Sequence, residues 1–146
     1  MLKRLPPLIS PDLLHALASM GHGDELALVD AHFPASRVAQ QGQNRLVRMP
    51  GINVDRALDA VLQVLPLDEA SPQSAWTMQV MGDPHAVPEA VSAINGVLNH
   101  HGLADAGSVE RFAFYEQAKN AYVLVQTGDI RTYANVMLRK GLVHHD

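Results

Sequence analysis

Apolar residues recur at spacings of three and four between residues 11 and 20, which predicts a helix with one buried face. Ser10 can cap the start of this helix, Pro11 suits its first position, and Gly21 can end it. The apolar side chains of the buried face are Leu13, Leu14, Leu17 and Met20.

Similar signals predict three further helices. Asn53 can cap a helix that ends near Pro66. Another helix runs from residue 88 to about residue 101, where Gly102 can stop it. A short third helix is predicted over residues 110–119.

Short runs rich in β-branched, aromatic and other apolar residues predict the strands, over residues 25–30, 76–81, 122–126 and 136–138. Because these strands alternate with the helices, we predict an α/β fold in which helices cover both faces of a sheet. The length of 146 residues matches one domain, residues 1–146, since domains typically have roughly 100 to 200 residues.

Composition narrows the classes of protein. The chain is 47% hydrophobic and 18% charged, which is typical of a folded globular protein. The absence of cysteine excludes thiol nucleophiles, disulfides, iron–sulfur clusters and cysteine-based zinc sites. A net charge of -4 without a basic block argues against a nucleic-acid partner. Neither a Gly-x-Gly-x-x-Gly motif nor a phosphate-binding loop is present, which disfavours nucleotide-dependent chemistry.

The sequence predicts no membrane segment. No apolar run approaches the roughly 18 residues needed to span a bilayer. Pro6 and Pro7 interrupt the basic N-terminus before the apolar stretch of a secretion signal develops. We therefore expect a soluble, cytoplasmic protein with no membrane partner.

The segment Gly21-His22-Gly23-Asp24 lies between a predicted helix and a predicted strand. Its glycines permit sharp backbone turns, so we expect the imidazole of His22 on a loop. Imidazole suits proton transfer in both directions near neutral pH when a neighbour fixes its tautomer. Asp30 is the expected neighbour, at the carboxyl end of the first strand, where ligands usually bind in open α/β sheets. A glycine-flanked histidine also fits an ordinary turn.

A metal site is an alternative interpretation of the same region. Four potential ligands occur within eleven residues: His22, Asp24, Asp30 and His32. They would suit a metal-dependent hydrolase or isomerase. No His-Glu-x-x-His helix accompanies them, and a carboxylate that ends a strand can orient a histidine as readily as it binds metal.

A second group of polar residues follows the last predicted strands. The segment Tyr133-Ala134-Asn135 comes after Thr127-Gly128-Asp129 across a polar loop, and it offers a phenol, an amide and backbone groups that can hold sugar hydroxyls. Arg111 can hydrogen-bond a polyol or pair with Glu110. Each of these residues also has an ordinary structural interpretation.

In order and spacing, these segments resemble the ribose pyranase and fucose mutarotase (RbsD/FucU) family, on the fucose mutarotase branch. The resemblance covers nearly the whole chain. It rests on residues 5–14, 20–25, 30–35 and 111–116, and on 127–129 to 133–135 together with Lys140-Gly141.

The resemblance implies a layered α/β/α domain with a mixed sheet. It also implies an enzyme that interconverts the α and β anomers of a free monosaccharide, L-fucose, without a cofactor or metal. Members of the family form homo-oligomeric rings, commonly decamers, with active sites at subunit contacts. By position, His22 matches the proton-transferring histidine and Asp30 a supporting, sugar-contacting carboxylate.

Arg111, Tyr133, Ala134 and Asn135 match sugar-binding positions of the family. Ala134 stands where glycine is often found, which is expected to narrow the approach of the backbone to the sugar. Two other functions are compatible with the resemblance: a D-ribose pyranase activity and a non-catalytic, monosaccharide-binding accessory role. Whether the second acid–base group is water or a tyrosine stays open.

Overall fold

A computed structural model describes residues 1–145, which form five helices and one six-stranded sheet. The strands are β1 (Glu25–Val29), β2 (Arg45–Met49), β3 (Ala75–Met78), β4 (Gly107–Val109), β5 (Val123–Thr127) and β6 (Val136–Arg139). The helices are α1 (Pro11–Ser19), α2 (Ala35–Gly42), α3 (Val54–Leu62), α4 (Glu89–His100) and α5 (Arg111–Lys119).

The sheet is mixed, with the strand order β2-β5-β1-β6-β3-β4. Strands β2, β5 and β1 are parallel, as are β3 and β4, whereas β6 runs antiparallel to both β1 and β3. Leu28 of β1 is paired with Val136 of β6. The residues that follow β1 therefore lie at the same edge of the sheet as the residues that precede β6.

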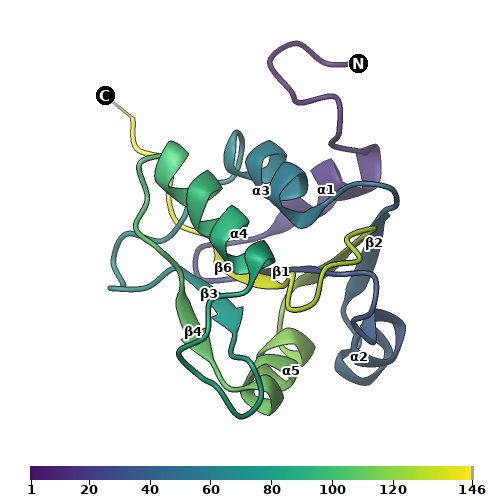
Figure 1. Cartoon of the computed structure of the whole chain (residues 1–146). Coiled ribbons are helices and arrows are strands. Elements are labelled where there is room, and N and C mark those ends of the chain that lie inside the picture. The colour runs from purple at the N-terminus through teal and green to yellow at the C-terminus, as the bar shows by residue number, and fades with distance from the viewer. Residues whose placement is uncertain (146) are drawn as a thin grey trace.

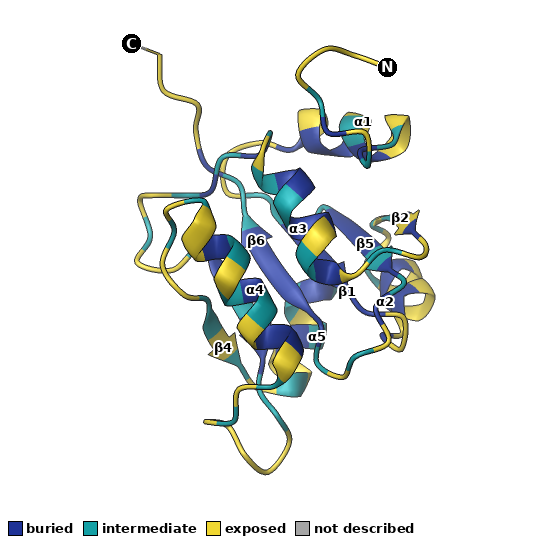
Figure 2. Ribbon diagram, turned by 45° about the horizontal axis from the view of Figure 1, so that its top comes forward, coloured by how far each residue is buried: buried dark blue, intermediate teal, exposed yellow. Residues whose placement is uncertain are grey.

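Helices cover both faces of the sheet, with α1, α3 and α4 on one side and α2 and α5 on the other (Figure 1). Successive residues of β1 alternate between two core clusters, as the pleat of a strand requires: Leu26 and Leu28 join the first, and Ala27 and Val29 the second. Buried residues line the helix faces towards the sheet, while exposed residues lie on the outer faces (Figure 2). The predicted α/β fold class and mixed sheet are confirmed.

The predicted elements are present, although some of their limits differ. The predicted strand 76–81 ends at Met78, because Val80 and Asp83 pair across a turn. The helix after Asn53 ends at Leu62, before Pro66, and the Asn53 side chain makes no capping hydrogen bond. Its first turn is capped instead by Asp129, whose carboxylate accepts a hydrogen bond from the Val54 N–H at 2.9 Å.

Three elements were not predicted. Helix α2 follows Pro34 without a side-chain cap, so it lacks the usual sequence signal for a helix start. Strand β2 carries an arginine at each end of its apolar pair, Leu46 and Val47, and only one face of it is buried. Strand β4 has three residues.

The Thr127-Gly128-Asp129 segment makes a close contact with the loop before α3. The Thr127 hydroxyl donates to the Val29 carbonyl at 2.9 Å, and the Gly128 N–H donates to the Ile52 carbonyl at 3.0 Å. A Cβ atom at position 128 would lie 2.4 Å from the backbone nitrogen of Gly51. Position 128 therefore requires glycine for close approach.

We predict that Gly128→Ala lowers the free energy of unfolding by about 1–3 kcal/mol, because the backbone at Gly51 has to move to admit the methyl group. Denaturant unfolding measures the change. Gly96→Ala is the control: Gly96 lies in α4 with open space around it, and alanine there is expected to stabilise the helix by about 0.5–1 kcal/mol. Equal stability of both variants would contradict the close-contact argument.

Within residues 1–145, no helix is long and apolar enough to cross a membrane.

Candidate functional site

A cavity of about 280 Å³ opens at the edge of the sheet where β1 ends and β6 begins. Four of the residues predicted for the site line this cavity: Asp30, Arg111, Tyr133 and Asn135. They come from the end of β1, the start of α5 and the loop before β6. The antiparallel pairing of β1 with β6 thus brings together residues more than 100 positions apart in the chain.

Asp30 is only 4% exposed, and both its backbone and its side chain form hydrogen bonds. Its N–H donates to Asn135 Oδ1 at 2.9 Å, and its carboxylate Oδ1 accepts from the His32 N–H at 3.0 Å. Burial raises the pKa of Asp30, and the backbone N–H groups of His32 and Phe33 oppose that rise. A desolvated carboxylate of this kind gains from any ligand hydroxyl that donates to it.

Asn135 and Tyr133 face the cavity from the loop before β6. Because Asn135 Oδ1 accepts from the Asp30 N–H, the Nδ2 amino group is the part of the side chain that can donate to a ligand. Tyr133 adopts a left-handed conformation, with a φ of 60°, and its hydroxyl accepts from the Met81 N–H at 3.1 Å. Because the hydroxyl oxygen is the acceptor in this contact, the Tyr133 O–H can still donate to a ligand.

Arg111 is the first residue of α5. Glu110 caps this helix, and its carboxylate accepts from the N–H groups of Phe112 and Ala113 at 2.9 and 3.1 Å. The Arg111 guanidinium instead turns to Tyr115, where Nε donates to the hydroxyl at 3.1 Å. This hydrogen bond raises the pKa of Arg111, so its positive charge is retained beside the cavity.

Five further residues complete the cavity wall: His32, Phe33, Met78, Thr132 and Tyr115. Only His32 was considered from the sequence, as a metal ligand; in the structure its Nε2 donates to the Ile130 carbonyl at 3.1 Å. Phe33 and Tyr115 lie in the segments 30–35 and 111–116 that carry the family resemblance, but neither these two residues nor Met78 and Thr132 were predicted to line a site. The rings of Phe33 and Tyr115 are in contact, with centroids 5.3 Å apart.

Ala134 does not line the cavity. Its side chain is fully buried and belongs to the core cluster beneath α1, α3 and α4. Its methyl group therefore packs in the core and does not reach the cavity, while a contact between the Ala134 backbone and a sugar stays a prediction.

His22 lies outside the cavity. The five residues of β1, an extended length of about 16 Å, separate its loop from Asp30. Its side chain is 47% exposed, and Nε2 lies 3.3 Å from Asp68 Oδ1. The expectation that Asp30 is the hydrogen-bond neighbour of His22 within the chain is wrong, because the two residues flank opposite ends of one strand.

The loop that carries His22 is held firmly. The Asp24 carboxylate accepts from the Gly21 N–H at 2.7 Å, and the Gly23 N–H donates to the Lys140 carbonyl at 2.9 Å. Gly23 has a φ of 89°, which glycine adopts without strain. Lys140 Nζ also donates to the last carbonyls of α1, so the end of β6 holds both α1 and the loop.

The four side chains considered as metal ligands do not gather at one point. His22 and Asp24 precede β1, while Asp30 and His32 follow it. Within residues 1–145, no group of three or more histidine, aspartate or glutamate side chains is arranged to hold a metal ion.

A buried ion pair anchors the loop that bears Tyr133 and Asn135. The Arg131 guanidinium donates to Asp129 Oδ2 at 2.8 Å and also pairs with Asp55 of α3. Asp129 is fully buried. Although burial alone would raise the pKa of Asp129, the hydrogen bonds from Arg131 and from the Val54 N–H outweigh it and hold the pKa below its ordinary value.

We predict that Asp129→Asn lowers the free energy of unfolding at pH 7 by about 2–4 kcal/mol, because Arg131 loses its charged partner. The folded-state pKa lies below the unfolded value of about 3.9, so this stabilisation is present above pH 4 and is lost as the pH falls through the folded-state pKa. Unfolding curves between pH 2.5 and 7 test this with Asp83→Asn, an exposed carboxylate, as the control. A stability difference that does not depend on pH would contradict the prediction.

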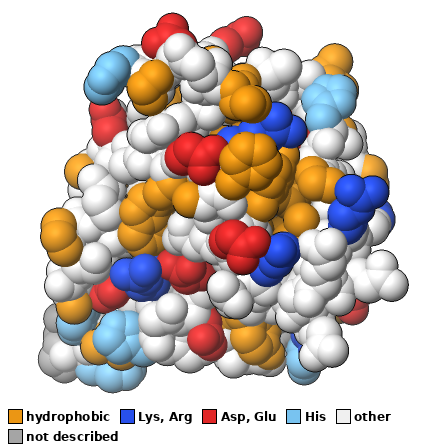
Figure 3. Space-filling view, turned by 90° about the horizontal axis from the view of Figure 1, so that it is seen from below, with side chains coloured by type: hydrophobic (Ala, Val, Ile, Leu, Met, Phe, Trp, Pro, Cys, Tyr) orange, Lys and Arg blue, Asp and Glu red, His pale blue; other side chains and the backbone are white. Residues whose placement is uncertain are grey.

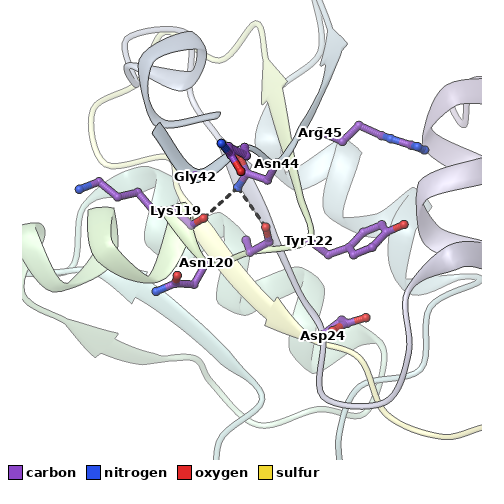
Figure 4. A pocket seen from close by; sticks show the side chains of 9 residues that line it. Asp24, Gly42, Asn44, Arg45, Lys119, Asn120 and Tyr122 are labelled. Carbon is purple, nitrogen blue, oxygen red and sulfur yellow. Dashed lines mark hydrogen bonds between the residues drawn. The ribbon is translucent and has the colours of Figure 1, made fainter. Parts of the chain in front are cut away.

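A larger hollow, of about 500 Å³, lies at the opposite edge of the sheet, between the ends of α2 and α5 (Figure 4). None of the residues predicted to bind or convert a sugar lines it, although Asp24, considered as a metal ligand, does. Asn44 Nδ2 donates there to the carbonyls of Ala118 and Ala121, at 2.9 and 3.0 Å, so the side chain joins the turn after α2 to the turn after α5. We therefore place the candidate site in the smaller cavity, where the polar side chains converge.

The fold and the cavity define a small α/β protein with a polar, monosaccharide-sized site at the edge of a mixed sheet. Residues 3–143 match the model of the RbsD / FucU transport protein family, and the chain belongs to that family.

Curated and structural relatives agree with this assignment. The human protein Fucose mutarotase is 40% identical over 146 residues, and the bovine protein of the same name is 38% identical over 145 residues. Each alignment covers 97% of this chain and 94% of the relative.

Two solved structures are similar over nearly the whole chain. The fucose mutarotase of Streptococcus pneumoniae, in complex with L-fucose, has a TM-score of 0.88 and 39% identity, and the match covers 98% of this chain and all of that chain. FucU from Bifidobacterium longum has a TM-score of 0.89 and 40% identity, with 97% of this chain and all of that chain covered.

Proposed function

We propose that this protein is an aldose mutarotase, an isomerase that interconverts the α and β anomers of L-fucose without a cofactor. The observation that carries the proposal is the convergence of Asp30, Arg111, Tyr133 and Asn135 on one small cavity. The human and bovine fucose mutarotases and the L-fucose complex of the Streptococcus pneumoniae enzyme, each 38–40% identical, support it.

The chemistry required is modest. Opening a pyranose ring needs one proton delivered to the ring oxygen and one removed from the anomeric hydroxyl. Rotation about the C1–C2 bond and reclosure then exchange the anomers. The reaction proceeds spontaneously in water, so positioned acid–base catalysis, typically about 100-fold to 10,000-fold, together with orientation of the open chain, is sufficient.

Binding groups of complementary character surround the cavity. Asp30 offers a carboxylate that accepts from sugar hydroxyls, while Asn135 Nδ2 and the Arg111 guanidinium offer donors. Phe33 and Met78 supply an apolar part of the wall. A mixed lining of this kind suits a sugar, whose ring presents hydroxyl groups and C–H groups together.

The proton donor comes from a neighbouring copy of the chain in this proposal. Within one copy the cavity has binding groups, but His22 is about one strand length away on an exposed loop. Assembly into a ring, in which the His22 loop of one copy reaches the cavity of the next, brings the two parts together. A shared site of this kind requires a homo-oligomer.

The rim of the cavity supports such a contact. Three large apolar side chains there are well exposed: Met81 at 57%, Phe112 at 60% and Ile130 at 77%. Met81 touches Arg111 and Tyr133, Phe112 stacks near Arg111, and the Ile130 carbonyl accepts from His32. Apolar side chains also gather on the face seen from the α5 end, with charged side chains among them (Figure 3). Exposed apolar patches are typical of interfaces.

We predict that His22→Ala and Asp30→Asn each slow the exchange of L-fucose anomers by about 100-fold or more, as the loss of acid–base or binding groups implies. Co-expression of the two variants is expected to restore activity at about a quarter of the sites, since random assembly pairs an intact His22 with an intact Asp30 that often. Saturation-transfer NMR measures the exchange rate.

The control is a co-expression of two chains that both carry His22→Ala, one of them also carrying Tyr133→Phe. No copy in this mixture supplies the His22 imidazole. It should stay inactive. If the first mixture also stays inactive while both variants assemble normally, the site is not shared between copies. An unchanged rate in His22→Ala alone would exclude His22 as the acid.

The sugar preference follows from Arg111 in this proposal. Arg111 lines the cavity and the relatives named fucose mutarotase are 38–40% identical, so L-fucose is expected to exchange faster than D-ribose. Exchange rates for the two sugars at equal concentration test the preference. Binding of L-fucose without faster exchange would instead favour an accessory, sugar-binding role.

We predict that Phe112→Glu disrupts the oligomer, because it places a charge on an apolar contact surface. Light scattering should show the mass falling towards the 15.8 kDa of one chain. Leu2→Glu is the control, since Leu2 is 62% exposed in the N-terminal segment, away from α5 (Figure 1). A wild-type mass near 15.8 kDa would overturn the ring itself.

A further inference from the structure

Gln126 lies in β5, and its side chain reaches the turn that follows β1. Its Nε2 donates to the Phe33 carbonyl at 3.0 Å and to the Asp30 carbonyl at 3.3 Å, across 93 and 96 positions of the chain. Gln126 is not one of the residues that line the candidate cavity. It therefore contacts the turn that presents Asp30 and Phe33 to the cavity, and it does so through backbone atoms.

Arg48 fixes the direction in which the Gln126 amide points. The two residues are register partners on the adjacent parallel strands β2 and β5, so their side chains stand on the same face of the sheet. Arg48 Nη1 donates to Gln126 Oε1 at 2.6 Å, and Nη2 donates to the hydroxyl of Ser36, in α2, at 3.0 Å. Because a guanidinium has no acceptor, Oε1 has to face Arg48, and Nε2 is left to face the two carbonyls.

The turn that Gln126 contacts carries three residues of the cavity wall. Its fourth residue, Ala31, lines a separate hollow of about 270 Å³, which Arg48 and Gln126 also line. The His32 N–H donates to the Asp30 carboxylate, so the position of that carboxylate depends on the backbone of the turn. A hydrogen-bond donor against this backbone therefore acts on the binding groups of the cavity without touching a sugar.

We propose that Gln126 is a positioning residue, which holds the turn 30–33 in the conformation that presents the Asp30 carboxylate to the sugar, and that Arg48 keeps the Gln126 amide in the required orientation. The inference rests on the proposed function and deepens it, because it assigns residues outside the cavity to sugar binding. Since both residues act through the backbone of the turn, their loss is expected to weaken binding more than it slows proton transfer.

A carboxylate at position 126 separates positioning from stability. Gln126→Glu keeps the acceptor for Arg48 and adds a charge that pairs with the guanidinium. It also removes the Nε2 donor, so that an oxygen faces the carbonyls of Asp30 and Phe33. The turn is expected to move away from the new carboxylate, while the ion pair with Arg48 keeps the strands and α2 together.

The test compares Gln126→Glu with wild type in binding, exchange and stability. The KM for L-fucose exchange and the Kd from calorimetry should rise about 5-fold to 20-fold while kcat changes less than about 2-fold, because the binding groups are displaced and the proton donor is not. The midpoint of denaturant unfolding should stay near that of wild type. A crystal structure of the variant should show the Asp30 carboxylate displaced. A lower unfolding midpoint with an unchanged KM would overturn the inference, since it would show a structural role only.

Gln41→Glu is the matched control. Gln41 is exposed near the far end of α2, the helix that carries Ser36, so this variant makes the same chemical change away from the turn. Its KM and kcat should equal those of wild type, and an equal rise in KM would overturn the inference by showing that the added charge alone is responsible. Arg48→Lys keeps a donor for Gln126 Oε1 and should retain most of the affinity, whereas Arg48→Met frees the amide to rotate and should raise KM.

Failure of the proposed function would look different. If wild type does not accelerate anomer exchange, the mutarotase proposal is wrong, and the crystal structure of Gln126→Glu still decides whether Gln126 holds the turn. If wild type is active but Gln126→Glu leaves KM, Kd and the Asp30 carboxylate unchanged, only the positioning role is wrong.

Discussion

The antiparallel pairing of β1 with β6 is the constraint on which the rest of the structure depends. At one end of this ladder, Asp30 is hydrogen-bonded to Asn135, and both residues line the cavity. At the other end, Lys140 holds the His22 loop. Because Glu25 pairs with Arg139 and Leu28 with Val136, neither end can shift without the other. One strand pair therefore builds the binding groups and supports the candidate acid, and it keeps the two apart.

Buried polar groups make the loop before β6 rigid. Thr127 and Asp129 are both buried. The Thr127 hydroxyl donates to the Val29 carbonyl, and the Asp129 carboxylate accepts from Arg131. An unpaired polar group at such depth is costly, so these contacts favour a single loop conformation. Tyr133 can then keep its left-handed backbone, which a non-glycine residue adopts only when its surroundings hold it there. The geometry of the cavity follows from an ion pair that lies outside it.

The sequence predicts the elements with strong local signals, such as α1 and β5, and the residues of the cavity that lie in recognisable segments. It does not predict α2, because this helix starts without a side-chain cap. It also does not predict that Asp129 caps α3, because that hydrogen bond joins positions 75 residues apart. Asp30 was expected beside His22, since eight positions look close in a sequence, yet an extended strand carries them apart. Asp68 carries no motif, and only the pairing of Leu67 with Lys140 brings it to His22.

A site divided between copies suits a reaction that needs little acceleration. Each copy can keep a desolvated carboxylate at Asp30 stable by itself, because the backbone N–H groups of His32 and Phe33 support it. Each copy can also expose an imidazole backed by a carboxylate, since the His22 side chain is 47% exposed and the Ala70 N–H supports the Asp68 carboxylate. Catalysis then arises only where the two surfaces meet, so the proposed activity depends on assembly. The apolar rim at Met81, Phe112 and Ile130 gives that assembly a driving force next to the cavity.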